Sequence, residues 1–580
     1  MYVSPHRAKT VADLDLGVAE RQAFGTVYGK PAKYELLAKL VKAGTLRLPP
    51  HPPWTGVVTD WAADPYRDRN WQFQHHTLRW LNPLRWAALE GDDEAATEWR
   101  RVAKSWGQAN VPARRAPGLF AWKDMADGNR AIQLSLGAPL IRPEDDWYIP
   151  LVEYHVDWLM DEEHIVQKNH ALHQNSGLLV AAALLRDRAA LETAHRRMVA
   201  QFVSTFDEQG ANDEGATGYH EMNLKWWGQA WDRVRAEGLE IPESVDAALE
   251  AGRSALAQLV LPNGMLSQIG DTKRVPVSRG LGSHVDFVAT QGEEGTAPHE
   301  TAVAYDRGYV VSRSGWGQER PLAEESHMIV RFGHDVLSHS HQDRGGVHLY
   351  TRGRSWLTDS GFFSYQTGDE TRAHFLSREA HNVASLPEFA HSDRAEVALE
   401  RFAKTEACHE VILRDHGYPG IELRRRVLYL TGPDCWIVWD QTSAPTRIQQ
   451  NWIVDIGLRL RRHDRGFELL DGGQTMTMTW LGGVPAFSRH LAKEGDPHGW
   501  IATKWKTLEP ASTISAQTPP NRQRCVVLIA PSAPQELAVV RSYITTAGLL
   551  SMVLTRGPRI WNVQADDSGV EVTEMDRDWD

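Results

Sequence analysis

Hydrophobic positions in the first half of the chain recur at helical spacing. From about Trp71 to Leu256, apolar residues three and four apart alternate with short polar connections, as in FQHHTLRWLNPLRWAALEGDDEAATEWRRVAKSW and NSGLLVAAALLRDRAALETAHRRMVAQFVSTF. Gly91 is a stop signal in the first of these segments. A run of paired helices without strands predicts a bundle, a solenoid or an α/α toroid.

The pattern changes after LPNGMLSQIGD, because short β-branched and aromatic runs separated by turn residues take over. These runs are GYVVSRSGW, MIVRFG, GGVHLYTRGRSWLTDSG, IELRRRVLYLTGPDCWIVWDQT, RCVVLIA and LLSMVLTRG. They predict an antiparallel β region that continues to the C-terminus. The boundary is expected between Asp271 and Tyr309, where GEEGTAPHE is typical of a linker.

Length and charge narrow the classes of protein. A chain of 580 residues is expected to form two or three domains. Its net charge of -12 argues against a general affinity for nucleic acid or anionic membranes, so an anionic ligand would need a local cationic pocket. The 3 cysteines include no CxxC pair, which indicates neither a disulfide framework nor a cysteine zinc site.

The N-terminal segment MYVSPHRAKTVADLDLG lacks the apolar core of a signal peptide, and no stretch approaches the ~20 apolar residues that span a bilayer. We therefore expect a cytoplasmic protein as the sequence is written, or a secreted or periplasmic one if a signal peptide has been removed. The 23 tryptophans exceed the 14 phenylalanines, and their flat rings suit the apolar face of a sugar, although most are expected in the core.

The segment RFGHDVLSHSHQDRGG is the richest in candidate chemistry. If it is extended, His339, His341 and Asp343 share one face, with neighbours roughly 6.6 Å apart. Two such imidazoles can serve one metal ion, or one can bind a metal while the other faces a substrate. Asp359 and His381 follow, and histidine and aspartate are donors that Zn²⁺ accepts. The alternative is a set of histidines that only make hydrogen bonds at a domain junction.

The helical half contains a second polar group, in QKNHALHQNSG. On a helix, Asn169, His170 and His173 occupy one arc. An amide beside an imidazole makes a pair of donors suited to a carboxylate, although a polar helix start would have the same composition.

A third group lies in FDEQGANDEGATGYHEMNLKWWG, where three glycines predict an irregular loop that ends as a helix begins near Tyr219. A tyrosine at such a loop end can donate a proton, or it can serve only as an anchor. Trp226 and Trp227 follow it.

The chain resembles the heparinase II/III-like polysaccharide lyases, which include heparin, heparan sulfate, alginate and oligoalginate lyases. The matching segments occur in the family's order over roughly residues 70 to 385: WQFQHHTLRW, QKNHALHQ, DEGATGYH, LPNGMLSQIGD, HSHQD, TDSGFFSY and REAHN. The resemblance implies an incomplete α/α toroid at 1–290, a central antiparallel β-sandwich at 300–480 and a C-terminal β-sheet region at 481–580.

The resemblance also implies an activity without a redox cofactor: β-elimination in a uronic acid-containing polymer, which leaves a 4,5-unsaturated uronate end. Asn169 and His170 would hold and neutralise the substrate carboxylate, as a developing enolate requires. Tyr219 matches the catalytic tyrosine, which protonates the leaving O4 and in some proposals also takes the C5 proton. His339 would be the base when that proton lies on the opposite face of the sugar.

The family's zinc ligands match His341, Asp359 and His381, and the metal is expected to be structural. Asp343 would then be a carboxylate that orients one of these rings. Further substrate contacts are expected from His173, Trp226, Trp227 and His374.

The chain departs from the family at one place. Alginate-cleaving members often carry a second tyrosine shortly before AHN, where this chain reads TRAHFLSREAHN, with His374 and Phe375. Tyr365 lies further upstream. If neither His374 nor Tyr365 takes that role, His339 and Tyr219 must carry both proton transfers, and an alginate assignment weakens.

Two other classes remain open on the sequence alone. A glycoside hydrolase on an α/α toroid would need two carboxylates ~5 to 9.5 Å apart, for example among Asp127, Asp213 and Glu214. A non-catalytic carbohydrate-binding protein is the other. The expected partner is an anionic polysaccharide or oligosaccharide, with neither nucleic acid nor membrane; the sequence leaves a homodimer open and does not specify the polymer.

Overall fold

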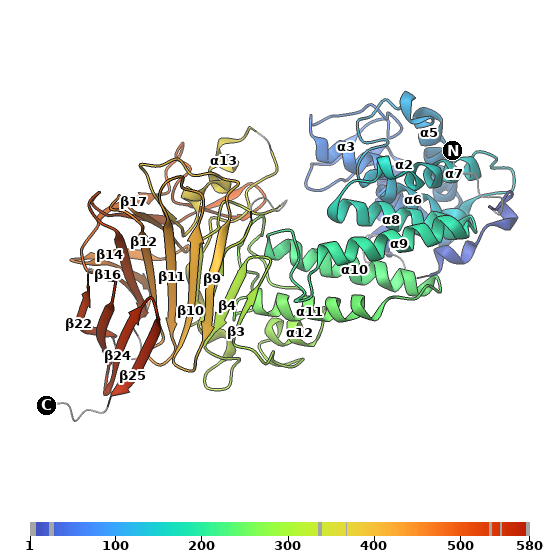
Figure 1. The fold of residues 1–580 in the computed structure, drawn as a ribbon. Coiled ribbons are helices and arrows are strands. Elements are labelled where there is room, and N and C mark those ends of the chain that lie inside the picture. Colours follow the sequence, from blue (N-terminus) through green and yellow to red (C-terminus); the bar gives the residue numbers. More distant parts are fainter. Residues whose placement is uncertain are drawn as a thin grey trace. The chain divides into compact units, whose positions relative to one another are not determined.

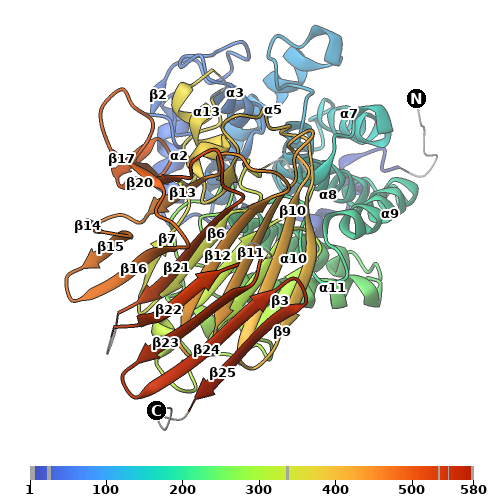
Figure 2. The same ribbon diagram turned by 60° about the vertical axis from the view of Figure 1, so that its left-hand side comes forward.

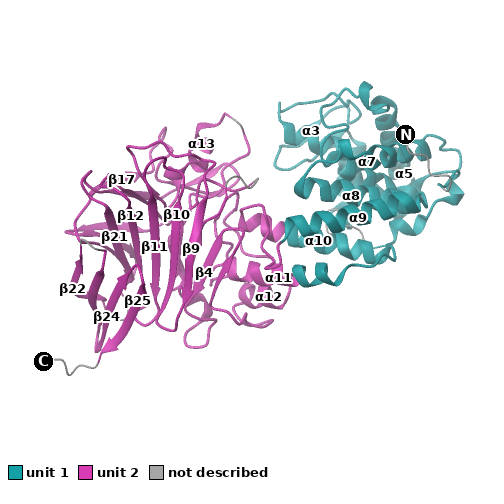
Figure 3. Cartoon of the chain, viewed as in Figure 1, with its two compact units in different colours: residues 1–206, 223–249 teal, residues 207–222, 250–580 magenta. Residues whose placement is uncertain are grey.

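The computed structural model describes residues 7–21, 28–334, 339–366, 368–532, 536–545 and 548–575. The chain forms two compact units, and Figure 3 colours them separately. Unit 1 comprises residues 1–206 and 223–249, and unit 2 comprises residues 207–222 and 250–580. Two helices, α10 (Thr217–Ala236) and α11 (Glu243–Leu259), contribute residues to both units.

Unit 1 is built mainly from helices (Figure 1). Besides its parts of α10 and α11 and the short pair β1 (Thr45–Leu46) and β2 (Trp54–Thr55), it contains α2 (Tyr34–Lys42), α3 (Arg69–His76), α4 (Asn82–Leu89), α5 (Asp93–Asn110), α6 (Ala126–Leu136), α7 (Tyr148–Met160), α8 (Lys168–Leu184) and α9 (Arg188–Thr205). Helix α8 is buried over nearly its whole length and packs against α6, α7 and α9. It is therefore the central helix of this unit.

Local sequence sets the helix ends as predicted. Gly91, between α4 and α5, has a φ of 100°, a conformation that costs glycine little. The Asp92 side chain then accepts a hydrogen bond of 2.9 Å from the backbone N–H of Ala95 and caps α5.

Among the described residues, no helix is both long and apolar enough to cross a membrane.

Unit 2 consists mainly of antiparallel sheets, with the short helices α12 (Ser283–Ala289) and α13 (Glu370–Leu376) between strands. The nine-stranded sheet contains β3 (Ala302–Tyr305), β4 (Tyr309–Arg313), β5 (His327–Arg331), β6 (Val347–Thr351), β7 (Arg354–Leu357), β8 (Ala384–Ser385), β13 (Gln449–Val454), β17 (Ala486–Leu491) and β20 (Ser512–Gln517). The eight-stranded sheet contains β9 (Val397–Lys404), β10 (Cys408–Asp415), β11 (Leu423–Leu430), β12 (Cys435–Thr442), β14 (Arg459–His463), β15 (Gly466–Asp471), β16 (Gln474–Leu481) and β21 (Arg524–Pro531). The smaller sheets are β18 (Trp500–Lys504) with β19 (Thr507–Pro510), and β22 (Ala538–Ile544), β23 (Leu550–Arg556), β24 (Arg559–Asp566) and β25 (Gly569–Met575).

The eight-stranded sheet is the middle of three layers (Figure 2). Successive side chains of a strand point to opposite faces. On β12, Trp436 and Val438 join a core shared with the nine-stranded sheet. Ile437 and Trp439 join a core shared with the four-stranded sheet β22–β25. Burial on both faces explains why this strand reads as a continuous apolar run rather than an alternating one.

The strands expected from the apolar runs are present as β4, β5, β6 with β7, β11 with β12, β21 and β23. Residues 481–531 supply β20, which pairs with β13, and β21, which pairs with β12 and β16, while β17 joins the nine-stranded sheet by pairing with β20. This part of the chain therefore shares both large sheets with residues 300–480.

Candidate active site

Three segments of unit 2 that are distant in sequence meet through backbone hydrogen bonds. The N–H of His339 donates to the carbonyl of Glu214 at 3.1 Å, and the N–H of Asp271 donates to the carbonyl of His339 at 2.9 Å. Gly270 makes this approach possible. Its φ is 58°, and an added Cβ would lie 2.4 Å from the His339 carbonyl oxygen.

The sequence left an extended HSHQD segment open, but the structure shows no strand there. The described residues from His339 to Gly346 lie outside any strand, in the connection between β5 and β6, and Ser338 lies outside the described residues. The reason is that the backbone of His339 bonds to residues 214 and 271 instead of to a neighbouring strand.

Two tyrosines and a histidine form a compact cluster around this junction. The hydroxyl oxygens of Tyr219 and Tyr365 are 2.5 Å apart. The rings of Tyr219 and His339 are stacked, with centroids 3.4 Å apart and planes 9° from parallel. Tyr219 lies in the first turn of α10, where the sequence placed it at the end of the glycine-containing loop.

Asp271 holds both histidines of the HSH segment. One carboxylate oxygen lies 3.0 Å from Nδ1 of His339, and the other lies 3.1 Å from Nε2 of His341. Burial opposes ionisation of this carboxyl group, but the hydrogen bonds from the two histidines lower its pKa well below the usual range. In a neutral ring of His339, donation from Nδ1 to the ionised Asp271 leaves the lone pair on Nε2, which lies 3.8 Å from Oε2 of Glu214.

The same surroundings keep the two tyrosines protonated. Burial, and then the neighbouring Tyr365, raise the pKa of Tyr219 far above its ordinary value. Burial, and then the charge of Asp271, raise the pKa of Tyr365 as well. Tyr219 thus holds a proton next to the ring of His339, so a possible donor and a possible acceptor lie side by side.

The three predicted metal ligands, His341, Asp359 and His381, lie together. One donor atom from each lies within 4.8 Å of the others, and all three residues are buried. Nδ1 of His341 and Nε2 of His381 are buried, and neither has a hydrogen-bond partner among the described residues. Burial opposes ionisation of Asp359. The charge of His381, and the hydrogen bond between its Nδ1 and Oδ2 of Asp359 at 2.7 Å, nevertheless lower the pKa of Asp359 to about 2. Two open nitrogens beside a carboxylate fit a zinc ion.

Asp343 does not orient these rings. Its carboxylate lies 3.2 Å from Nε of Arg331, and this pair is buried. The carboxylate that contacts a ring of this group is instead Asp271, which lies 3.1 Å from Nε2 of His341 and leaves Nδ1 of that ring without a partner among the described residues.

The polar helix start of unit 1 contains the other predicted catalytic residues. Asn169 and His170 lie in the first turn of α8, and Asp124 accepts a hydrogen bond from His170. One turn on, His173 makes an edge contact with Trp226 at 5.2 Å. Burial, and then the positive charge of Arg79, lower the pKa of His173 to about 3. We therefore expect its ring to be neutral at physiological pH.

Trp227 and Asp127 are interior residues of unit 1. Trp227 is fully buried and packs against Phe202 and Trp231, which corrects its prediction as a substrate-binding residue. Asp127 is buried and accepts hydrogen bonds from Gln174 and from the indole of Trp158, so it is committed to internal contacts.

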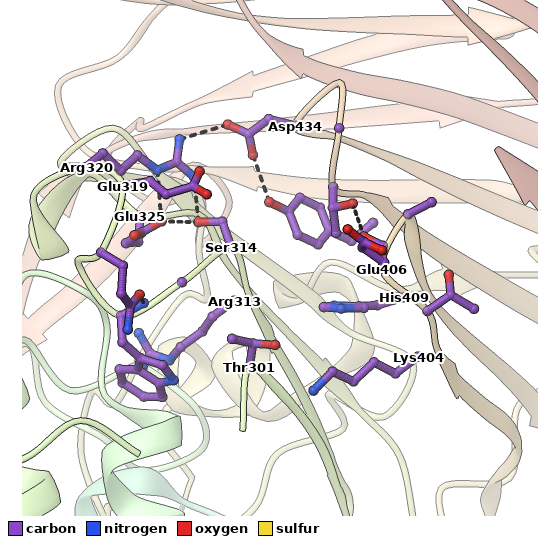
Figure 4. Close-up of a pocket in the computed structure, with 18 of the residues that line it drawn as sticks. Thr301, Arg313, Ser314, Glu319, Arg320, Glu325, Lys404, Glu406, His409 and Asp434 are labelled. Atoms are coloured by element: carbon purple, nitrogen blue, oxygen red, sulfur yellow. Dashed lines mark hydrogen bonds and ion pairs between the residues drawn. The ribbon is translucent and has the colours of Figure 1, made fainter. Parts of the chain in front are cut away.

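A cavity of about 1300 Å³ in unit 2 contains none of the predicted site residues (Figure 4). The guanidinium group of Arg320 lies 2.9 Å from Glu325 and 3.0 Å from Asp434, and Arg559 lies 2.7 Å from Glu574. Because these charges neutralise each other, the cavity offers no concentrated positive charge to an anionic polymer.

The sequence did not assign a role to Asp271 or Arg372. The guanidinium group of Arg372 lies 3.5 Å from Asp271 and also donates to the carbonyl of Ser364. The one available signal for Asp271 was its place directly after a glycine at the end of LPNGMLSQIGD. Tyr365, noted as lying upstream of the expected second tyrosine, is the residue that contacts Tyr219.

Comparisons with known proteins agree with the fold and with the sequence motifs. Residues 296–518 match the family model for the heparinase II/III-like C-terminal domain. A heparin-sulfate lyase of Bacteroides thetaiotaomicron is 23% identical over 407 residues, which are 62% of this chain and 57% of that protein. The match thus spans a little over half the length of this relative.

Solved structures match over almost the whole chain. The heparan sulfate lyase of Pedobacter heparinus aligns with a TM-score of 0.72 and 17% identity, covering 97% of this chain and 93% of that one. A crystal structure of heparinase III aligns with a TM-score of 0.76 and 16% identity, covering 97% and 94%. The predicted fold class, an incomplete α/α toroid followed by antiparallel β-sheets, is confirmed.

Proposed function

We propose that this protein is a polysaccharide lyase that cleaves a uronic acid-containing polymer by β-elimination, since residues 296–518 match the heparinase II/III-like C-terminal family model. The observation that carries the proposal is the pairing of a proton donor with a proton acceptor. Tyr219, whose pKa is raised, stacks on His339, whose Nδ1 is held by Asp271.

The reaction needs one proton removed and one delivered. In our proposal, Nε2 of His339 takes the C5 proton of the uronate, and the electron pair left on C5 forms the C4–C5 double bond. The C4–O4 bond breaks, and O4 receives the phenolic proton of Tyr219. The resulting imidazolium and phenolate then restore each other by proton transfer after product leaves.

Removing the C5 proton builds negative charge on the substrate carboxylate, which must be neutralised. We propose Asn169 and His170 for this task, as the family resemblance implies. Their position in the first turn of α8 supports the proposal, because backbone N–H groups at a helix start favour an anion.

We further propose that His341, Asp359 and His381 bind a structural zinc ion. The open, buried nitrogens of His341 and His381 support this assignment. The bound ion would tie the segment before β6 to Asp359, which follows β7, and to His381, which precedes β8.

The first prediction concerns the product. When the protein is incubated with a polymer that is its substrate, it should generate 4,5-unsaturated uronate ends, which are detected by their ultraviolet absorbance and by mass spectrometry. Heparan sulfate comes first in the panel because of the named relative, followed by heparin, chondroitin sulfate, hyaluronan and alginate. Saturated ends carrying an oxygen from labelled water would instead identify a hydrolase.

The second prediction concerns Asp271 as a positioning residue. Asp271→Asn removes the negative charge between two histidines and should lower kcat by about 10- to 100-fold, with KM little changed because the carboxylate is buried. Zinc affinity should fall as well, since Asp271 orients His341. Steady-state kinetics and elemental analysis measure the two effects.

Asp343→Asn is the matched control, because this buried carboxylate lies in the connection that contains His339 and His341 but pairs with Arg331. It should lower the unfolding temperature and leave the kcat of the folded protein and its zinc content unchanged. Equal effects on kcat in the two variants would contradict the role of Asp271.

A further inference from the structure

Three histidines from separate segments of unit 2 meet outside the cluster described above. His374 lies in α13, His490 lies in β17, and His498 lies between β17 and β18. The ring centroid of His498 is 4.5 Å from that of His374 and 5.0 Å from that of His490. The imidazole of His498 is thus the centre of the group.

The ring of His498 is held in one orientation. One carboxylate oxygen of Asp496 accepts hydrogen bonds from the backbone N–H of His498 at 3.0 Å and from its Nδ1 at 2.7 Å. The carbonyl of Asp496 in turn accepts from the indole of Trp500 at 3.0 Å. Because Nδ1 donates to a carboxylate, the lone pair of the neutral ring is on Nε2. Metal-binding imidazoles commonly donate their other ring N–H to a carboxylate in this way, and the hydrogen bond fixes the orientation of the ring.

The open nitrogen of His498 faces a further donor. Its Nε2 lies 3.5 Å from Oε2 of Glu379, and one donor atom from each of His374, Glu379 and His498 lies within 4.8 Å of the others. Donors around a tetrahedral zinc ion are roughly 3.4 Å apart, given bonds of about 2.0 to 2.1 Å. To bring the three donor atoms from their present separations to this value, the side chains must move by roughly 1 Å. Partly exposed side chains can make such a movement by small rotations.

The donor types indicate the class of ion. Calcium and magnesium prefer oxygen ligands, whereas imidazole nitrogens select zinc, nickel, copper or cobalt. We propose that His374, Glu379 and His498 bind a divalent metal ion such as zinc, nickel, copper or cobalt, and that Asp496 positions His498. This site shares no residue with the buried group of His341, Asp359 and His381.

Such an ion would fasten α13 to the connection between β17 and β18. Helix α13 also carries Arg372, which reaches Asp271. The ion would therefore stabilise the helix next to the proposed lyase cluster. The metal site itself does not depend on the lyase proposal. The sequence-based prediction that His374 binds substrate stays a prediction.

The test uses the full-length protein as purified, titrated with Co²⁺ and followed by the visible absorption of tetrahedral or five-coordinate cobalt, with Zn²⁺ as competitor. The wild type should bind one Co²⁺ that His498→Ala does not bind. Asp496→Asn should bind it about 10- to 100-fold more weakly. His416→Ala, which replaces an exposed histidine outside the group, should match the wild type.

Equal cobalt binding by wild type and His498→Ala would overturn the site. Loss of binding in His490→Ala but not in Glu379→Gln would overturn the proposed ligand set. The side chain of His498 is 29% exposed, so metal-free His498→Ala should unfold at the wild-type temperature. If metal-free His498→Ala unfolds at a lower temperature, cobalt binding is measured on His374→Gln instead. Cobalt binding retained by His374→Gln would then overturn the proposal. None of these readouts requires lyase activity, so failure of the metal site is distinct from failure of the proposed function.

Discussion

Replacing Tyr219 with phenylalanine is expected to lower kcat by about 10²- to 10⁴-fold, the usual range for a lost general acid or base. The substitution removes one oxygen and keeps the ring that stacks on His339. Burial and Tyr365 raise the pKa of this phenol, so it carries its proton at the pH of the assay and can deliver it to O4. The measurement is kcat on the polymer that the panel identifies, together with a melting curve that should match the wild type.

Two other tyrosines give this experiment its controls. Tyr365→Phe removes the hydroxyl that contacts Tyr219 but not the proposed donor, so its effect on kcat should be smaller. Tyr543→Phe makes the same chemical change at a half-exposed position on β22 and should leave kcat unchanged. Near-normal turnover in Tyr219→Phe, or a larger loss in Tyr365→Phe, would show that the proton donor has been misassigned.

The second large effect is expected from His341→Ala, which should lower metal content, unfolding temperature and activity together. The side chain of His341 is 1% exposed and lies between Asp271 and the other proposed zinc ligands. Its loss leaves a buried carboxylate without one partner, at a cost of about 3 kcal/mol, and removes metal binding that contributes to folding. Chelation of the wild type should likewise lower the unfolding temperature.

His339→Ala separates the two neighbouring histidines. Its side chain is 16% exposed and contacts Asp271 and Tyr219, but it is not among the grouped donor atoms. We expect kcat to fall while zinc content stays at the wild-type level. Elemental analysis and melting curves of both variants decide between them. Zinc retained in His341→Ala but lost in His339→Ala would reverse the roles assigned to the two histidines. Absence of zinc from the wild-type protein would contradict the proposed buried zinc site.

The sequence by itself determined the order and class of the elements. Apolar spacing of three and four residues marked the helices, and short β-branched and aromatic runs between turn residues marked β4, β5, β11 and β12, because both signals are local to one element. The start of α10 next to Tyr219 and the end of α4 before Gly91 followed from local chemistry in the same way. The ordered motifs also identified the zinc-ligand candidates that the structure brings within reach of each other.

Tertiary structure alone decided which of these residues lie together. Trp226 and Trp227 are adjacent in sequence, but neighbours on a helix point about 100° apart, and packing determines that Trp227 enters the core. Asp271 joins both histidines because Gly270 allows its segment to reach His339, a contact between residues 68 positions apart that no local pattern records. The same long-range backbone bonds hold HSHQD out of a strand. Residue spacing specifies direction within an element, whereas contacts between elements depend on the packing of the whole unit.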